Sequence, residues 1–255
     1  MTTPLIDLSG RTAVVTGGSR GVGRATAILL ARAGADVAIS YRSRVSDAEA
    51  TVCEIEGLGR RGFHRAGDLC DREAVEAFMD EAEQRLGGID FVIGNHGVWP
   101  PDDVALADMD DARWRRTMEI NLDSIFYLCR SAAGRVRTGG RIVLVSSTAG
   151  QRGEAFHGDY AASKGAMISL VKGFCIELAP RQITVNTVAP GWIDTEMAHP
   201  AFEDGARERI ADAIPIGRIA TAADVAGPIV FLCSELGRHV TGEVLNVNGG
   251  AVLVG

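Results

Sequence analysis

Tyr160 and Lys164 are the pair of side chains in this sequence best suited to proton transfer. They stand four residues apart in a run of helical period, so they share one face of the expected helix. A lysine cation about 5 Å from a phenol, at an effective dielectric constant of about 20, lowers the phenol's pKa by ~2–2.5 units from about 10. A chance pair on an exposed helix is the alternative, but the only other lysine is Lys172. We therefore predict that Tyr160 is a general acid–base activated by Lys164.

Ser147 follows a short apolar run, Arg141–Ser146, that is typical of a buried strand. It falls at the carboxyl end of that strand, thirteen residues before Tyr160. A serine hydroxyl in this place can donate a hydrogen bond to a carbonyl oxygen and stabilise the charge that develops on it when hydride arrives. We predict that Ser147 steadies the oxygen to which Tyr160 gives its proton.

A glycine-rich turn connects the first expected strand, Thr12–Thr16, to a helical run. The turn reads Gly17-Gly-Ser-Arg-Gly-Val-Gly23. Glycine permits positive φ and close backbone approach, and the amides at a helix N-terminus bind a pyrophosphate. A glycine cluster alone is often a simple turn, but a strand before it and a helix after it favour a nucleotide site.

Strands and helices alternate along the chain, which predicts one α/β domain with a doubly wound parallel sheet of about seven strands and helices on both faces. The expected strands are Thr12–Thr16, Asp36–Tyr41, Gly62–Ala66, Phe91–Ile93, Arg141–Ser146, Thr184–Val188 and Val244–Val247. The expected helices are Val22–Arg32, Asp47–Leu58, Arg72–Arg85, Asp111–Ala133, Tyr160–Leu178 and Ala222–Leu236. Within this domain, 1–255, we expect a nucleotide-binding half over about 1–100 and a catalytic and substrate half over about 101–255. The stretch 192–219 lacks strand signal and is expected to cover the substrate.

Composition excludes several classes of protein. The net charge of −7 gives no general attraction to nucleic acid or an anionic membrane. The longest apolar stretches, Ala25–Ala31 and Ala226–Cys233, fall far short of the ~20 residues of a membrane span, and the first residues do not resemble a signal peptide. Five scattered cysteines without a C-x-x-C pair indicate reduced thiols and no metal site. We predict a cytoplasmic protein with neither nucleic acid nor membrane as a partner.

The glycine spacing resembles the nucleotide motif of the short-chain dehydrogenase/reductase family, and the resemblance covers the whole chain. It rests on Thr16–Gly23, Asp68-Leu69, Tyr160-Ala-Ala-Ser-Lys164, Pro190-Gly191 and the tail Val240–Gly250, all in the family's order. It implies a Rossmann-like fold and NAD(P)-dependent oxidation or reduction. It also implies that Ser147 is the catalytic serine, with Ser146 structural, and that Asn121 holds a water linking Lys164 to solvent.

The resemblance carries a full set of site residues onto this chain. The catalytic residues are Asn121, Ser147, Tyr160 and Lys164. The cofactor-binding residues are Gly17, Ser19, Arg20, Gly21, Val22, Gly23, Tyr41, Arg42, Ser43, Asp68, Leu69, Asn95, Gly97, Tyr160, Lys164, Pro190, Gly191, Ile193 and Thr195. Lys164 would also bind the nicotinamide ribose, and the segment from Pro190 to Thr195 would seat the carboxamide.

The end of the second expected strand indicates which dinucleotide binds. An NAD enzyme has a carboxylate there for the ribose 2′-hydroxyl. This chain has Tyr41, followed by Arg42, and a further arginine, Arg20, lies in the glycine loop. The planar guanidinium suits a 2′-phosphate, so we predict NADP(H). A solvated surface charge is the alternative for these arginines, and it fits Arg44 better than Arg42.

One motif departs from the family pattern. Many members have Asn-Asn-Ala-Gly after the fourth strand, whereas this chain has Gly94-Asn-His-Gly97. His96 either faces the cofactor or fills a gap, and a lone histidine without an orienting partner favours the gap. His157, Trp99 and Trp192 are further candidates for the wall of a substrate pocket.

The leading functional prediction is NADPH-dependent reduction of a ketone, and the chain most resembles 3-oxoacyl-[acyl-carrier-protein] reductases. The substrate is then a ketone or a 3-oxoacyl thioester, and acyl carrier protein is a candidate partner. A dehydrogenase of a sugar, polyol, steroid or other secondary alcohol is the alternative, and a non-catalytic dinucleotide-binding regulator is a remote one. Family members are typically homotetramers.

A carrier protein is acidic, so docking it would need a local basic patch. The segment Arg130–Arg141 holds four arginines and no acid, and Arg181 stands where the carrier-protein reductases are basic. In those relatives comparable residues lie beside the active-site mouth. A solvated helix end, favoured by the helix dipole, is the alternative.

Overall fold

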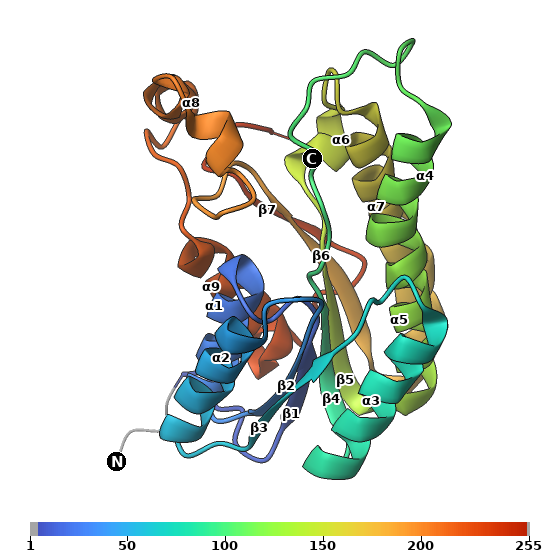
Figure 1. Cartoon of the computed structure of the whole chain (residues 1–255). Helices are drawn as coiled ribbons and strands as arrows, with labels where there is room; N and C mark the ends of the chain where they lie inside the picture. Colours follow the sequence, from blue (N-terminus) through green and yellow to red (C-terminus); the bar gives the residue numbers. More distant parts are fainter. Residues whose placement is uncertain (1–4, 254–255) are drawn as a thin grey trace.

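A parallel sheet of seven strands forms the centre of the molecule (Figure 1). The computed structural model describes residues 5–253, and the strand order is β3-β2-β1-β4-β5-β6-β7. The strands are β1 (Thr12–Val15), β2 (Asp36–Tyr41), β3 (Gly62–Ala66), β4 (Ile89–Gly94), β5 (Val136–Val145), β6 (Thr184–Pro190) and β7 (Val244–Val247). The chain winds outward in both directions from β1 and β4, so the switch point where ligands bind such sheets lies between these two strands.

Helices cover both faces of the sheet, as the alternating pattern predicts (Figure 1). One face is covered by α1 (Gly21–Arg32), α2 (Val45–Gly57) and α9 (Ala222–Cys233). The other is covered by α3 (Arg72–Leu86), α5 (Ser124–Arg135) and α7 (Gly158–Leu178). Both faces of the central strands are buried, which explains their continuous apolar runs. The prediction of a Rossmann-like doubly wound domain is confirmed.

Local signals in the sequence fix the ends of these helices. The Asp71 side chain accepts a hydrogen bond from the N–H of Glu73 and starts α3, while Gly87, at a φ of 86°, ends it in the left-handed conformation. Thr221 and Asp224 form a reciprocal capping box at the start of α9. Capping residues therefore define where α3 and α9 begin, and Gly87 defines where α3 ends.

The helix expected over Asp111–Ala133 is interrupted. It forms α4 (Asp111–Met118), a π-helical turn over Glu119–Asp123, and then α5. The wider turn admits one extra residue, and Asn121 inside it is fully buried. Hydrophobic period alone predicted one continuous helix because a single wide turn leaves the apolar face nearly unchanged.

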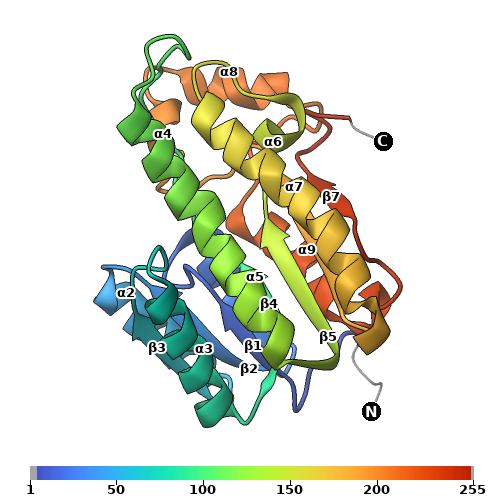
Figure 2. The ribbon, with the colours of Figure 1, turned by 90° about the vertical axis from the view of Figure 1, so that its right-hand side faces the viewer.

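Two short helices lie beyond the carboxyl ends of the strands and were not predicted. They are α6 (Thr148–Arg152), directly after Ser147, and α8 (Ala206–Ala213). A 3-10 turn, His199–Phe202, precedes α8. Figure 2 shows α8 lying across the top of the molecule, beyond the ends of β5 and β7. The segment 192–219 thus crosses over the carboxyl ends of the strands, where the strands lead into their loops.

Candidate active site

A long cleft opens at the carboxyl ends of the strands and collects most of the residues that the sequence indicates. The cleft is lined by Gly17, Ser19, Arg20, Gly21, Val22, Tyr41, Arg42, Ser43, Asp68, Leu69, Asn95, Gly97, Ser147, Tyr160, Lys164, Pro190, Gly191, Ile193 and Thr195. Gly23 and Asn121 are the two predicted residues that do not line it. Both are buried behind its wall.

The glycine turn packs so closely against neighbouring residues that side chains could not be accommodated in it, and the lack of side chains leaves its backbone open to a dinucleotide. A Cβ on Gly23 would lie 2.2 Å from the carbonyl oxygen of Gly17, and one on Gly18 would lie 2.5 Å from the Ile39 side chain. Gly17 and Gly21 have φ values of 64° and 53°, which favour glycine. The cradle therefore presents main-chain amides at the start of α1, and it fits a pyrophosphate.

Lys164 is a buried cation at the centre of the cleft. Its Nζ donates to the carbonyl oxygen of Val145 at 2.8 Å and lies 5.9 Å from the centre of the Tyr160 ring. The Ser146 hydroxyl donates to the main-chain oxygen of Lys164 at 2.8 Å, which ties α7 to the end of β5. Burial lowers the pKa of Lys164 to about 8.

Tyr160 differs from the expectation drawn from its spacing to Lys164. Burial raises the pKa of Tyr160 to about 12, a hydrogen bond with the Ser147 hydroxyl lowers it, and the charge of Glu154 raises it again. The expected net lowering of the Tyr160 pKa is wrong for this structure, because the pairwise Coulomb argument left out the cost of burying a phenolate. Ser147 also accepts a hydrogen bond from the N–H of Ala149 at 3.1 Å and so starts α6.

Asn121 holds the loop after β4. Its Oδ1 accepts from the N–H of Val98 at 2.8 Å, and its Nδ2 donates to the Val98 oxygen at 2.9 Å and to the Ser163 hydroxyl at 3.1 Å. A Cβ on Gly97 would meet Asn121 Oδ1 at 3.0 Å and Lys164 Nζ at 3.3 Å. The π-helical turn therefore places the Asn121 side chain near the ammonium group of Lys164, with Gly97 next to both.

His96 fills a gap between β1 and α5. Its Nδ1 lies 2.8 Å from the Thr16 hydroxyl and its Nε2 lies 2.7 Å from the Ser124 hydroxyl. Burial and the nearby charge of Lys164 lower the pKa of His96 to about 3, so the ring is neutral. His96 therefore bridges Thr16 and Ser124 through both ring nitrogens, and it also lines the cleft.

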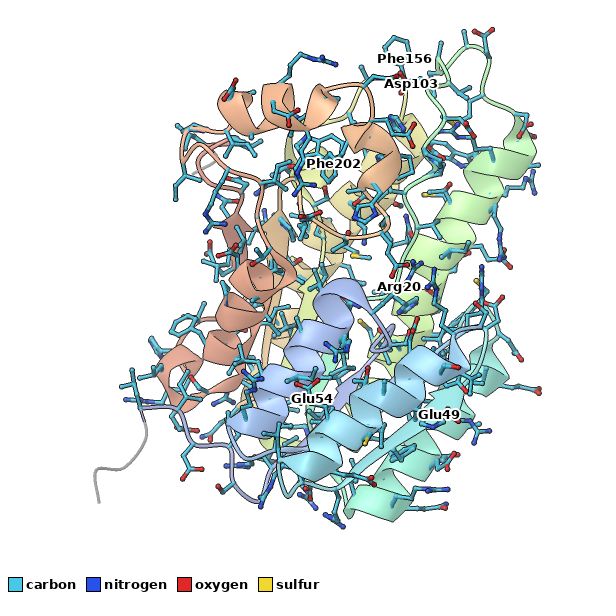
Figure 3. All side chains as sticks on the ribbon, turned by 60° about the vertical axis from the view of Figure 1, so that its left-hand side comes forward. Arg20, Glu49, Glu54, Asp103, Phe156 and Phe202 are labelled. Atoms are coloured by element: carbon cyan, nitrogen blue, oxygen red, sulfur yellow. The ribbon has the colours of Figure 1, made fainter. Side chains whose placement is uncertain are left out.

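An acidic residue, Glu196, reaches the basic end of the cleft from the segment after β6. Its carboxylate forms ion pairs with Arg20 at 2.5 Å and with Arg44 at 2.8 Å. Arg44, expected to be a surface charge, and Glu196 both line the cleft. Figure 3 labels Arg20 near the start of α1. The ion pairs of Glu196 could not be predicted from the sequence, because its two partners stand more than 150 positions earlier in the chain.

The aromatic candidates form a cluster. The ring of Trp99 stacks on His157 with centroids 4.7 Å apart and meets Trp192 edge-on at 5.9 Å. Trp192 in turn contacts Phe202 at 5.8 Å, so the cluster links the loop after β4, the start of α7 and the segment before α8. Trp99 Nε1 donates to Glu154 Oε1 at 3.2 Å. Glu154 had not been singled out from the sequence.

The predicted basic patch lies away from the cleft. Arg137 is the second residue of β5, whereas Ser147 follows the other end of that strand, where the cleft lies. Arg137 donates to Asp90 and Gly87, and Arg181 donates to the carbonyl oxygens of Ala133 and Val136. These two guanidinium groups are bound to their own chain, so the expectation that they flank the active-site mouth is wrong for this subunit.

Neither a metal cluster nor a membrane span is found in residues 5–253. No group of three or more histidine, cysteine, aspartate or glutamate side chains there is arranged to hold a metal ion. None of the helices described is both long and apolar enough to cross a bilayer.

Comparison with known proteins agrees with this geometry. A family model described as enoyl-(acyl carrier protein) reductase matches residues 17–252. The L-rhamnose 1-dehydrogenase (NAD(P)(+)) of a Sphingomonas species is 37% identical over 95% of this chain and 96% of its own. The 3-oxoacyl-[acyl-carrier-protein] reductase FabG of Vibrio cholerae is also 37% identical, over 98% of this chain and all (100%) of its own.

Solved structures extend the likeness. A short chain dehydrogenase from Burkholderia cenocepacia, crystallised in complex with NADP, is 38% identical with a TM-score of 0.90, over 96% of this chain and 98% of that one. This chain belongs to the short-chain dehydrogenase/reductase family. It is therefore an oxidoreductase of a family that uses a nicotinamide dinucleotide. A sugar dehydrogenase and a 3-oxoacyl-[acyl-carrier-protein] reductase match it at the same identity, so identity alone does not select a substrate.

Proposed function

We propose that this enzyme reduces a ketone to a secondary alcohol with NADPH. The observation that carries the proposal is the meeting of Tyr160, Ser147 and Lys164 in one cleft with the glycine cradle. NADPH, when bound there, supplies the hydride. The side chains of Tyr160 and Ser147 then hold the substrate oxygen, and Tyr160 gives it a proton.

The protonation states support the direction of reduction. A phenol whose pKa is about 12 carries its proton at neutral pH and can donate it. Lys164, with a pKa of about 8, is mostly charged at neutral pH and stabilises the phenolate left behind. Since the Asn121 side chain is engaged with Val98 and Ser163, we propose that a water reaching Lys164 binds a main-chain carbonyl of the π-helical turn instead.

The basic end of the cleft supports NADPH over NADH. Tyr41, Arg42 and Arg44 follow one another along its wall, where an NAD enzyme places a carboxylate. Arg42 is exposed and lies in reach of a ligand on that wall. We propose that its guanidinium binds the 2′-phosphate.

The substrate class has two candidates. A 3-oxoacyl thioester is supported by the 3-oxoacyl-[acyl-carrier-protein] reductase among the relatives, although the patch around Arg137 and Arg181 gives no support to carrier docking on this subunit. Oxidation or reduction of a sugar or polyol is supported by the L-rhamnose dehydrogenase and by the aromatic cluster at Trp99. We propose that the segment 192–219 covers the substrate in either case.

Two further properties belong to this proposal. We propose a homotetramer packed through α5 and α7, which carry the exposed apolar side chains Phe126 and Ile176.

We also propose a cytoplasmic setting, since the five cysteines are all unpaired.

Replacing the phenol hydroxyl tests the chemistry. Tyr160→Phe should lower kcat at least ~10²-fold while the Kd for NADPH stays within about threefold, as expected for a lost general acid. The assay follows NADPH oxidation with an activated diketone, and NADPH binding is measured separately. If Tyr160→Phe turns over within threefold of the parent, the mechanism is wrong. If the parent binds NADPH but reduces none of a panel of ketones and acyl thioesters, a non-catalytic regulator is the better description.

A further inference from the structure

Glu154 is a half-buried carboxylate in the turn that leads to Tyr160. It lies in the turn between α6 and α7, six residues before Tyr160, and its side chain is 21% exposed. Its charge raises the pKa of the Tyr160 phenol. Its partner Trp99 directly follows Val98, which lines the cleft. Neither lysine nor arginine reaches it within 4.0 Å in the part of the chain that the structure describes, and His157 Nδ1 lies 3.9 Å away.

Trp99 holds this carboxylate in a fixed orientation. The indole Nε1 donates to Oε1 at 3.2 Å, and the same ring stacks on His157 at an interplanar angle of 14°. The other oxygen, Oε2, accepts no hydrogen bond from a residue that the structure describes. Burial raises the pKa of Glu154, as it does for a carboxylate stripped of part of its water. Such a group gains most from a ligand that donates a hydrogen bond to it.

The surroundings of Glu154 suit a ring with hydroxyl groups. Trp99 and Trp192 meet at 80° and form an apolar corner. Figure 3 shows Phe202, the next ring of this cluster, on the orange segment, with Asp103 and Phe156 labelled above it on the neighbouring loops. His157 is 4% exposed, and its Nε2 is buried without a hydrogen-bond partner. Flat apolar faces beside polar atoms with unfilled hydrogen bonds match the alternation of C–H faces and hydroxyl groups in a polyol.

We propose that Glu154, positioned by Trp99, accepts a hydrogen bond from a substrate hydroxyl group, so that this site selects neutral hydroxylated ketones and sugars over plain or anionic ones. The proposal rests on the proposed function and narrows its substrate class. An acyl chain offers no donor to Glu154 near the reacting carbonyl. A substrate carboxylate there would face a like charge, which is strongly unfavourable in a half-buried site.

Matched ketone pairs test the selection. The pairs are 2-hydroxycyclohexanone with cyclohexanone, 4-hydroxycyclohexanone with cyclohexanone, and 1-hydroxy-2-butanone with 2-butanone. For at least one pair the parent enzyme should show a kcat/KM at least ~10-fold higher for the hydroxylated member, as expected for a hydrogen bond to a charged acceptor. Ethyl 3-oxobutanoate should likewise be preferred over the 3-oxobutanoate anion.

Variants assign the preference to Glu154. Glu154→Gln and Glu154→Ala should each lower the hydroxylated-to-deoxy ratio of kcat/KM by about tenfold, and Glu154→Gln should raise the relative rate with the anion. Using a ratio cancels any general effect of the lost charge on Tyr160. Trp99→Phe keeps an aromatic ring but removes the N–H donor, so it should lower the ratio in part. Asp103→Asn is the matched control, because Asp103 is exposed, lies 3.8 Å from His157, and is not bonded to Trp99.

The outcomes separate this inference from the proposed function. A parent that reduces deoxy ketones as well as hydroxylated ones, with ratios unchanged in both Glu154 variants, overturns the inference and leaves ketone reduction intact. A ratio that falls equally in Asp103→Asn also overturns it, since a general field effect then suffices. A parent that reduces none of these ketones overturns the proposed function instead.

Discussion

Glu196 and Arg44 are joined by an ion pair of 2.8 Å that crosses the cofactor cleft. Glu196 belongs to the segment after β6, and Arg44 precedes α2, so the pair ties the substrate side of the cleft to the nucleotide side. Arg20 in the glycine turn binds the same carboxylate. The carboxylate thus pairs with two cations that would otherwise be free to bind a phosphorylated ligand.

Removing the charge of Glu196 should strengthen NADPH binding. In Glu196→Gln the two arginines are free to bind phosphate groups, so we expect the Kd for NADPH to fall at least ~3-fold, and the effect to shrink at high salt because these side chains are exposed. Titration of cofactor fluorescence measures it. Glu203→Gln, a neutralised acid on the same segment, is the control. Unchanged or weaker NADPH binding in Glu196→Gln would show that the ion pairs do not compete with the cofactor.

Arg42 should discriminate between the two dinucleotides. Only NADPH has a 2′-phosphate, so Arg42→Ala should raise the Kd for NADPH by ~10-fold or more and leave that for NADH within about twofold, as expected for the loss of a charge-assisted hydrogen bond. Direct titration of both cofactors gives the comparison. Equal weakening of the two would mean that Arg42 acts on the structure of the loop, and a parent that prefers NADH would contradict the assignment.

The reductive rate should fall as the pH rises through about 8. The pKa of Lys164 is lowered to that value by burial, so its charge is present below it and lost above it. Without the cation the phenolate formed on Tyr160 loses its stabilisation, and kcat/KM for reduction decreases. Oxidation of the alcohol needs the phenolate and should instead accelerate with pH, because the pKa of Tyr160 is about 12. Profiles of kcat/KM against pH in both directions check these signs.

The exposed lysine is the control for this profile. Lys172→Met should keep the reductive profile of the parent. Lys164→Met should be nearly inactive, with its residual rate independent of pH around 8. A parent profile that is flat between about pH 7 and 9 would contradict the role of Lys164.

Asp159 should contribute strongly to the stability of the fold. Its side chain is fully buried, and it accepts hydrogen bonds from Thr117 at 2.7 Å and from Arg113 at 3.2 Å, which joins α4 to the start of α7. Asp159→Ala leaves the Arg113 cation, itself only 16% exposed, without its partner, so the free energy of unfolding should fall by ~3–5 kcal/mol. Urea unfolding measures the change.

The matched control for Asp159 is an exposed ion pair on α4, the helix that carries Arg113. Asp111→Ala removes a carboxylate that lies 3.9 Å from Arg115 and is 94% exposed, and its effect should stay within ~0.5 kcal/mol. Burial alone would raise the pKa of Asp159, but the hydrogen bonds from Thr117 and Arg113 outweigh burial and lower it. Its contribution is therefore present at neutral pH and lost as the pH falls through the lowered value. Similar losses in the two variants would contradict the special role of the buried pair.

The sequence predicted the elements and most of the cleft because both depend on local pattern. Apolar runs and helical period located the strands and helices. The order of the motifs predicted that Gly17, Asp68, Tyr160 and Pro190 share one site, and all four line the cleft. The π-helical turn at Glu119–Asp123 was missed, since a single wide turn hardly disturbs hydrophobic period.

Features that depend on distant contacts could not be predicted in this way. The pairing of Glu196 with Arg20 joins segments that share no motif. The pKa of Tyr160 depends on burial by the whole fold, which outweighs the neighbouring charge that spacing reveals. The positions of Arg137 and Arg181 at the far end of the sheet follow from topology, whereas the sequence shows only that they are basic.

The unequal burial of the two lysines makes it possible to modify one of them selectively. Lys164 is enclosed beneath the cleft, whereas Lys172 is exposed two turns further along α7. An amine-reactive dye or an activated resin would therefore attach, apart from the chain's amino terminus, at one defined side chain. Attachment there leaves the cleft open, because Lys172 lies toward the other end of the helix from Tyr160. In an assembly that covers α7, labelling of Lys172 would be slow and would quicken on dilution, so the same reaction would report dissociation of the subunits.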